Sequence, residues 1–441
     1  MNESQKNYKQ KNIMSYNNSR VLVSTVGAWS DAVGSNTMSE LFREYDKTKL
    51  ACLYIRADVS DSTSCRRYFH IYEGRVMKSI YKRRISTGEE YTLGAFERAS
   101  NDLNEEKARY DSFRRKKNWF YSFSREFVWV LGKWKSKELD AFLDDFNPEV
   151  LVCPIESYIH FNRINEYIIK KKQPRVIGFL WDDNFTYKQH PRSIGYKMHR
   201  WWLRHSVKRL VKQCETVVAL SPKMKAEADA AFGINSVLLT KPIFDQPPFN
   251  HYKPSSPLRL LYTGNLYVDR DETIADIVDA IREVNKDAQR VILDVYTSTA
   301  IKPSLENRIK VDGCCVVHDP VKQSEVLGLQ KEADVLLFVE SLNDDGSGSA
   351  RLSFSTKITD YFCAGKCIWA VGTNQLSAID YLEKQDAALC STSKDAIRPM
   401  LERIVSNDVV INQYAQKGWQ CGHDNHNATE ILSKMYKIIY P

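Results

Sequence analysis

Short apolar runs alternate with amphipathic stretches through the second half of the chain, from Leu258 onward. Runs rich in β-branched and aromatic residues are typical of buried strands, whereas apolar positions three and four apart are typical of helices. The pattern predicts six strands, at residues 259–263, 291–296, 315–317, 335–339, 367–371 and 387–390. It predicts helices at residues 272–285, 323–332, 357–363, 377–383 and 394–405, then a helical tail over 411–439 interrupted near Gly422.

The first half has the same alternation with longer insertions, and predicts strands at residues 20–26, 50–55, 149–152, 175–180 and 216–220. Strands joined by helices form a parallel sheet whose ligands bind at the carboxyl ends of the strands. Between the halves, residues 242–257 hold five prolines and no periodic pattern, as a linker does. We expect an α/β protein of two Rossmann-like domains facing across a cleft: a flexible N-terminus at 1–19, an N-terminal domain at 20–245, a linker at 246–257, and a C-terminal domain with its helical tail at 258–441.

The segment 353–366 predicts a phosphate site, because a Ser/Thr-rich loop runs there into a short helix that Gly365 ends. Ser355 and Thr356 stand at the helix start, where backbone N–H groups and the positive end of the dipole favour anions. Lys357 adds a cation, and Asp360 follows one turn later, where it could accept hydrogen bonds from ribose hydroxyls. The alternative is that a hydroxyl only caps the helix and that both charges are solvated.

Three motifs in this half resemble those of GT-B glycosyltransferases, in particular the bacterial group that makes capsule, exopolysaccharide and lipopolysaccharide. Residues 357–366 (KITDYFCAGK) are similar to the donor-site helix of that family. Residues 333–340 (ADVLLFVE) resemble the strand that ends beside the donor sugar, and residues 262–266 (YTGNL) the glycine loop after the first strand. The resemblance implies the GT-B architecture and a nucleotide-sugar donor.

The resemblance also implies roles for individual residues. Arg270 and Lys357 would neutralise the diphosphate, and Asp360 would hold the ribose. Where retaining members carry a first acid, eight residues before Asp360, this chain has Leu352; Glu340 could substitute, and retention or inversion stays open. The donor-binding residues implied in this way are Gly264, Asn265, Ser355, Thr356, Lys357, Asp360 and Tyr361.

The N-terminal half offers two strand-end loops. Residues 26–37 form a glycine-containing loop that either turns the chain or contacts substrate. Asp182 and Asp183 follow another strand, in the region that lies near the acceptor in the resembling family. Either could be a general base, although a turn or capping role for Asp183 is as well supported.

A metal-dependent GT-A enzyme is a further alternative, because Asp269-Arg270-Asp271 has the spelling of an Asp-x-Asp metal site. The motif is short, and it comes after the linker instead of after an N-terminal nucleotide-binding unit. The resemblance to GT-B enzymes therefore leads us to expect no metal and no other cofactor, with the nucleotide sugar as substrate.

Charge is concentrated locally more than overall. The net charge is only +8, from 63 Lys and Arg and 55 Asp and Glu, and no recognition module accompanies it, which disfavours nucleic acid as a partner. Residues 196–213 predict a basic amphipathic helix without acids. Together with residues 114–117 (RRKK), Trp119 and Phe120, it would either dock on anionic lipid or pack on the N-terminal domain.

Ten irregularly spaced cysteines, mostly in apolar runs, favour reduced thiols and a cytoplasmic location. We find no apolar window of membrane-spanning length and no signal segment. We therefore expect a cytoplasmic enzyme, peripheral at most to the inner membrane face, that passes a hexose or related sugar to a glycan or lipid-linked acceptor in bacterial surface polysaccharide synthesis. The alternative is a catalytically silent adaptor of GT-B fold, which Leu352 favours.

Overall fold

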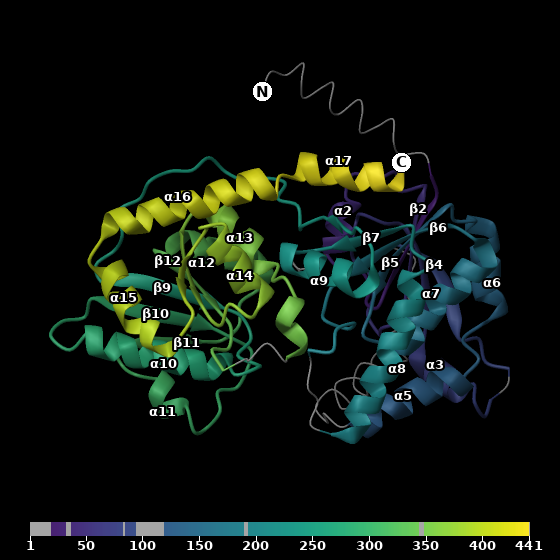
Figure 1. Cartoon of the computed structure of the whole chain (residues 1–441), viewed down its shortest axis with the longest axis horizontal. Coiled ribbons are helices and arrows are strands. Elements are labelled where there is room, and N and C mark those ends of the chain that lie inside the picture. Colours follow the sequence, from purple (N-terminus) through teal and green to yellow (C-terminus); the bar gives the residue numbers. More distant parts are fainter. Residues whose placement is uncertain are drawn as a thin grey trace, which may run out of the picture. The chain divides into compact units, whose positions relative to one another are not determined.

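A computed structural model describes residues 19–31, 37–82, 84–93, 119–188, 193–343 and 348–440 (Figure 1). The chain divides into unit 1, comprising Met1–Leu239 and Ile431–Pro441, and unit 2, comprising Thr240–Glu430. The sequence placed the boundary in the proline-rich segment, but residues 240–257 belong to unit 2. It also placed the whole helical tail in the second domain, whereas the final residues return to unit 1.

Unit 1 holds an eight-stranded sheet in the order β4-β3-β2-β1-β5-β6-β7-β8, parallel except for β4. Its strands are β1 (Val21–Thr25), β2 (Leu50–Tyr54), β3 (Arg67–Ile71), β4 (Gly88–Thr92), β5 (Val150–Ile155), β6 (Arg175–Leu180), β7 (Thr216–Ala219) and β8 (Val237–Leu238). Its helices are α2 (Thr37–Leu41), α3 (Glu73–Lys78), α5 (Trp119–Leu131), α6 (Lys137–Phe146), α7 (Ile159–Lys172), α8 (Ile194–Val211) and α9 (Pro222–Phe232). The five predicted strands are confirmed, and β3, β4 and β8 are additional.

Unit 2 holds a parallel six-stranded sheet in the order β11-β10-β9-β12-β13-β14. Its strands are β9 (Leu258–Thr263), β10 (Val291–Tyr296), β11 (Cys315–His318), β12 (Val335–Val339), β13 (Cys367–Val371) and β14 (Leu389–Ser391). Its helices are α10 (Arg270–Val284), α11 (Glu306–Ile309), α12 (Gln323–Glu332), α13 (Lys357–Ala364), α14 (Ser377–Lys384), α15 (Ile397–Val405) and α16 (Asp408–Asn425), with 3-10 turns η1 (Ser349–Leu352) and η2 (Lys394–Ala396). All six predicted strands are confirmed.

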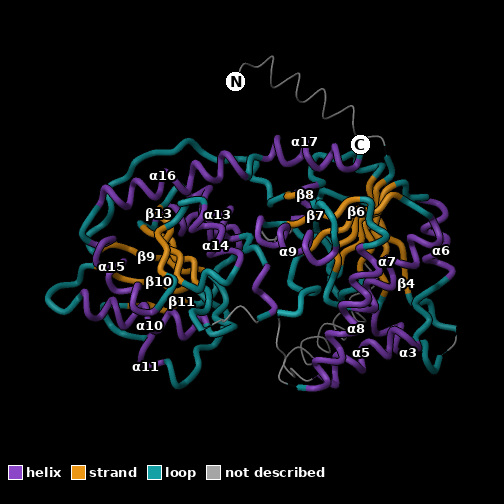
Figure 2. The backbone as a smooth tube through the Cα atoms, viewed as in Figure 1, coloured by secondary structure: helices purple, strands orange, loops and turns teal. Residues whose placement is uncertain are grey.

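The central strands β12 and β13 of unit 2 are apolar on both faces, in keeping with the helices that cover both faces of the sheet in Figure 2. Along β12, Leu337 enters the cluster that includes Ile274 of α10, whereas Leu336 enters the cluster that includes Ile358 of α13. Burying each such side chain contributes about 1.5–3 kcal/mol. The alternation fixes α10 on one face of the sheet and α13 on the other.

The helical tail breaks between α16 and α17 (Ala428–Ile439), five residues after Gly422 where the sequence predicted the interruption. Gly422 is helical, and a Cβ there would lie 2.7 Å from Cβ of Phe362, so glycine is needed for close packing of α16 on α13. In unit 1, Tyr45 of the α2 region hydrogen bonds Tyr440 at 2.6 Å, and Arg175 donates to the carbonyl of Ile439 at 2.5 Å. These bonds tie the last residues to the sheet of unit 1.

Candidate functional site

The loop after β9 in unit 2 is built around a close approach between Gly264 and Lys357. Gly264 has φ +152°, and a Cβ there would overlap the Lys357 ammonium. That ammonium lies 5.2 Å from the centroid of the Tyr262 ring, a cation–π distance. Glycine leaves this space to the lysine side chain, and the end of the first strand of unit 2 and the start of α13 lie together at the carboxyl edge of the sheet.

Arg270 and Glu340 complete a charged cluster with Lys357. Arg270 starts α10, and its Nε and Nη2 donate to one carboxylate oxygen of Glu340 at 2.9 and 2.6 Å. Glu340 follows β12, where its N–H donates to Val371 at 2.8 Å. Burial and the neighbouring Arg270 guanidinium lower the pKa of Lys357 to about 8, against the opposing attraction of Glu340. Two cations therefore face one carboxylate in a partly buried position, which suits an additional anion.

Asp360 lies one turn into α13 and pairs with Lys241, a residue that the sequence analysis did not identify. The Nζ of Lys241 lies 3.4 Å from Oδ1 of Asp360, and the lysine side chain is only 7% exposed. Burial raises the pKa of Asp360, while Lys241 and Lys357 lower it. Nothing in the sequence signals this pair, because Lys241 comes 119 residues earlier in the proline-rich segment.

The remaining predicted donor residues divide into two groups. Thr356 stands at the start of α13 but makes no capping hydrogen bond through its side chain, and Ser355 beside it is partly exposed. Asn265 is exposed, and its side chain accepts from Ser298 at 2.9 Å. Tyr361, in contrast, is buried, and its hydroxyl donates to Leu337 at 3.0 Å. The hydrogen bond of this hydroxyl therefore joins α13 to β12 within the core.

The Asp-x-Asp motif is neutralised by a lysine. Nζ of Lys302 lies 3.2 Å from Asp269 and 3.1 Å from Asp271. Within the described ranges, we find no group of three His, Cys, Asp or Glu residues placed to hold a metal ion. The ammonium of Lys302 therefore offsets part of the negative charge of the two aspartates.

In unit 1, the strand-end carboxylates include one that the sequence analysis missed. Glu156 follows β5 and Asp182 follows the neighbouring β6, so both stand at the carboxyl edge of the sheet. Burial and the negative charge of Asp182 raise the pKa of Glu156 to about 7, against the attraction of Arg56. Glu156 could have been found by the strand-end rule, since it directly follows an apolar run.

Asp183 has the turn role that was one of its two predicted alternatives. It is buried, and its carboxylate accepts from the N–H of Thr186 at 3.0 Å and from its hydroxyl at 2.5 Å. Its carbonyl also accepts from Arg200 at 3.1 Å. Asp182, by contrast, is exposed beside Glu156. Of the two aspartates, Asp182 is the one accessible to a ligand.

The basic segment forms helix α8, as predicted. Leu203, Val207 and Leu210 are buried, so one side packs inward, while Met198 and Trp201 are exposed. Residues 114–117 of the second basic stretch lie outside the described residues, as do residues 32–36 of the glycine loop and residues 1–18. All ten cysteines are free thiols. None of the helices in the described ranges is both long and apolar enough to cross a membrane.

Comparisons with known proteins identify solved structures of similar fold. The sequence matches no protein-family model and no curated protein. Among solved structures, HepE of Anabaena in complex with UDP is similar over 95% of this chain and 99% of HepE, with a TM-score of 0.58 and 8% identity. WaaG, a glycosyltransferase involved in lipopolysaccharide biosynthesis, is similar over 95% of this chain and 99% of WaaG, with a TM-score of 0.54 and 10% identity.

TarM of S. aureus, whose structure is also similar, is a longer protein. The match covers 68% of this chain but 57% of TarM, with a TM-score of 0.52 and 10% identity, so this chain spans little more than half of TarM. Two Rossmann-like units, each with its own sheet, are incompatible with the single-domain GT-A alternative. This chain has the fold of the GT-B glycosyltransferases.

Proposed function

We propose that this chain transfers a sugar from a nucleoside-diphosphate sugar to a glycan or lipid-linked acceptor in the synthesis of a bacterial surface polysaccharide. The observation that carries the proposal is the cluster of Arg270, Glu340 and Lys357 around Gly264 at the carboxyl edge of unit 2. This edge is where doubly wound sheets bind nucleotides. The cluster has an excess of positive charge at the start of a helix, which favours a diphosphate.

The proposed chemistry requires stabilisation of a leaving group. As the bond between sugar and diphosphate breaks, negative charge grows on the phosphate oxygens, and fixed cations stabilise it without reorganisation. Lys357 and Arg270 supply these cations. Binding the diphosphate raises the pKa of Lys357 from about 8, because a nearby anion favours its charged form. Asp360 accepts hydrogen bonds from the ribose, with Lys241 holding its carboxylate in place.

The acceptor hydroxyl must lose a proton, and Glu156 is our candidate for the base, with Asp182 beside it. A base whose pKa lies near the working pH combines an ionised fraction with useful basicity. The pKa of about 7 for Glu156 meets that condition. Asp182 thus has a role besides its contact with solvent, since its negative charge raises the pKa of Glu156 toward the working pH.

The similar structures support the choice of donor and of pathway. HepE has been solved with UDP and with UDP-glucose, and TarM with UDP. WaaG is described as acting in lipopolysaccharide biosynthesis. At 8–10% identity these likenesses support the class of reaction and leave the sugar, the base and the acceptor to experiment.

The test is nucleotide binding followed by turnover. Thermal-shift measurements with UDP, GDP and CDP, and with their sugars, should show stabilisation by one nucleotide family. We expect Lys357→Ala to lose that stabilisation and to slow release of the nucleoside diphosphate about 10²–10³-fold, the usual effect of removing one transition-state contact. Lys331→Ala, at an exposed lysine on α12, is the matched control and should leave both unchanged.

Two outcomes would contradict the proposal. Stabilisation without diphosphate release from any sugar donor, in a chain that a partner transferase requires, would establish the silent adaptor instead. Loss of activity in chelator would show that metal is needed and would bring Asp269 and Asp271 back into consideration.

A further inference from the structure

Unit 1 exposes two rows of large apolar side chains on the adjoining helices α5 and α8. On α5 the exposed residues are Phe127, Val130 and Leu131, and on α8 they are Ile194, Met198 and Trp201. Leu131 is 63% exposed and Ile194 is 77% exposed. We call these six residues the apolar face. Large apolar patches on a protein surface usually mark an interaction site.

The two rows belong to one surface because α5 packs directly on α8. Phe123 of α5 lies 5.6 Å from the ring of His199 and 6.3 Å from that of Trp202, both on α8. Phe127 comes one helical turn after Phe123, on the same side of α5. Figure 1 shows α3, α5 and α8 together in unit 1.

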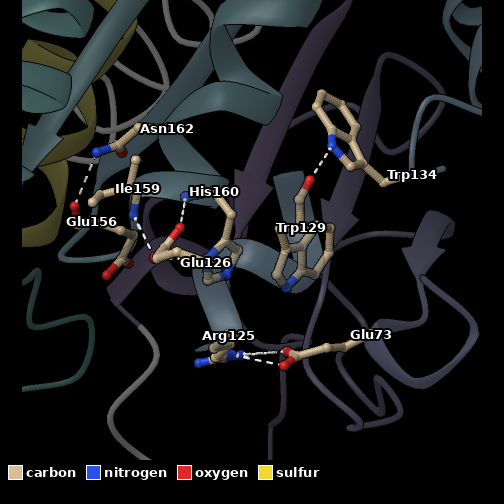
Figure 3. Close-up of polar contacts among 9 residues, drawn as sticks. All are labelled: Glu73, Arg125, Glu126, Trp129, Trp134, Glu156, Ile159, His160 and Asn162. Atoms are coloured by element: carbon tan, nitrogen blue, oxygen red, sulfur yellow. Dashed lines mark hydrogen bonds and ion pairs between the residues drawn. The ribbon is translucent and has the colours of Figure 1, made fainter. Parts of the chain in front are cut away.

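Charged groups on the inner side of α5 fix its orientation (Figure 3). The Glu126 carboxylate accepts from the N–H groups of Ile159 and His160 at 3.1 and 2.8 Å, at the start of α7, and lies 2.9 Å from Nδ1 of His160. Arg125 donates through Nε at 2.8 Å and through Nη2 at 2.5 Å to Glu73 of α3. Glu126 is thus an anion bound at a helix N-terminus.

This anchoring prevents the apolar face from turning inward. Trp129 is fully buried and stacks on His160 at 4.8 Å, and its carbonyl accepts from Trp134 at 3.0 Å (Figure 3). Rotating α5 to hide Phe127 and Val130 would expose Trp129 and leave Glu126 without its partners, at a cost that exceeds the burial gained. The exposure of the apolar face is therefore built into the packing of unit 1.

The charges that border this face are positive. Helix α8 contains no Asp or Glu, and Lys197, Lys208 and Lys212 are exposed along it or at its end. At the far end of α5, the N–H of Lys133 donates to Ser79 at 2.9 Å, which places the exposed Lys133 beside the end of α3. Exposed Ile80 and Tyr81 follow there, next to Lys82.

We propose that the apolar face docks on an anionic phospholipid bilayer, with its apolar side chains entering the interface and the bordering lysines contacting the headgroups. Apolar groups ringed by lysines, with no acids on α8, match the chemistry of an anionic leaflet. Aromatic residues such as Phe127 and Trp201 suit the boundary between headgroups and acyl chains. This docking is independent of the donor chemistry, so either can fail without the other.

Vesicle flotation of the full chain tests the proposal. The wild type should float with vesicles of phosphatidylcholine and phosphatidylglycerol, and not with phosphatidylcholine alone. Phe127→Glu combined with Trp201→Glu should reduce binding more than tenfold, because both residues would have to carry a charge into the interface. Lys197→Glu combined with Lys208→Glu should reduce vesicle binding at least about fivefold per site. The difference from the wild type should shrink at high salt, because salt screens the attraction between lysines and headgroups.

Matched controls on unit 2 separate docking from general effects. Val409→Glu replaces an apolar residue that is 77% exposed, and Lys331→Glu replaces an exposed lysine on α12; both should bind vesicles as the wild type does. Unchanged thermal stability and unchanged nucleotide-induced stabilisation would show that each variant is folded. No binding of the wild type to anionic vesicles at low salt would overturn the proposal. Self-association of the wild type that Phe127→Glu abolishes, without lipid binding, would assign the face to a second copy of the chain instead.

Discussion

The two units place charged side chains of opposite sign at the carboxyl edges of similar parallel sheets. In unit 2, Lys357 and Arg270 outweigh Glu340. In unit 1, Glu156 and Asp182 outweigh Arg56. The topology brings strand ends together in both, but the side chains decide whether the edge attracts an anion or removes a proton. Function therefore follows from the sign of the charge at each edge more than from the fold.

The largest expected effect comes from removing the carboxylate of Glu156 at the acidic edge of unit 1. Glu156→Gln should lower kcat about 10²–10⁴-fold, the range for loss of a general base, while nucleotide-induced stabilisation stays unchanged. Asp182→Asn is the companion variant. By removing the negative neighbour, it lowers the pKa of Glu156 from about 7, so the acidic limb of the pH–rate profile should move to lower pH. A normal kcat in Glu156→Gln would show that Glu156 is not the base, and the departing diphosphate would then be the proton acceptor.

A second variant tests the cationic edge of unit 2 by changing the glycine next to Lys357. Gly264→Ala puts a methyl group where the Lys357 ammonium lies and strains a backbone with φ +152°. Nucleotide affinity should fall about 30–150-fold, an estimate from a cost of about 2–3 kcal/mol. Gly328→Ala is the control, because a Cβ at that position in α12 meets open space. Equal nucleotide affinities in the two variants would contradict the close approach of Gly264 and Lys357.

A third prediction compares the buried histidines of the two units. Burial first, and then the positive charge of Arg75, lower the pKa of His70 to about 3, and burial lowers that of His426 to about 4. Since an unfolded histidine titrates near 6.5, the unfolded chain binds the extra protons, and stability falls as the pH drops below that value. Each histidine contributes about 1.4 kcal/mol per pH unit between its two pKa values.

His70→Phe tests this linkage, since the ring of His70 stacks on Tyr54 at 4.4 Å and phenylalanine preserves that contact. Between pH 6 and pH 5 the variant should lose less thermal stability than the wild type, measured by calorimetry of the full chain. Parallel curves for the two proteins would show that His70 is not the group that couples stability to pH.

The smallest expected effect concerns how Asp360 is held. Lys241→Met removes the cation that lies 3.4 Å from Asp360, so the pKa of Asp360, which burial already raises, rises further. Nucleotide affinity should fall about fivefold, a change of about 1 kcal/mol, and the loss should grow as the pH is lowered. Lys384→Met, at an exposed lysine paired with Asp380, should have no effect. A pH-independent loss would indicate that Lys241 contributes by packing alone.

The sequence predicted unit 2 better than unit 1 because the physical signals differ. Strands β12 and β13 are apolar on both faces and are bounded by helices, so the expected limits agree with the structure. Strand β3 carries Arg67 and His70 within its length, and β4 reads GEEYT with exposed glutamates. Strand β4 is at the edge of the sheet and β3 lies between β4 and β2, and both owe their formation to pairing with neighbours, a tertiary effect that local periodicity does not contain.

The candidate site was predictable where residues adjoin strand ends and unpredictable where distant segments meet. Gly264 and Glu340 directly follow strands, Lys357 starts α13, and the structure brings the three together at the carboxyl edge of unit 2. Lys241 lies in an irregular segment, and its pairing with Asp360 depends on the folded path of the chain. From the sequence, Asp183 could be either a general base or a turn residue. The hydrogen bond from the N–H of Thr186, which only the structure shows, assigns it to the turn.

The return of the final residues to unit 1 has a consequence for how the protein is made. Unit 1 begins the chain, yet Tyr45 and Arg175 find their partners Tyr440 and Ile439 only after unit 2 has been synthesised. On the ribosome, the first unit emerges early but its last helix emerges at the end. The first unit to appear is therefore the last to be completed, and a chain that stalls within unit 2 carries a first unit without its closing helix.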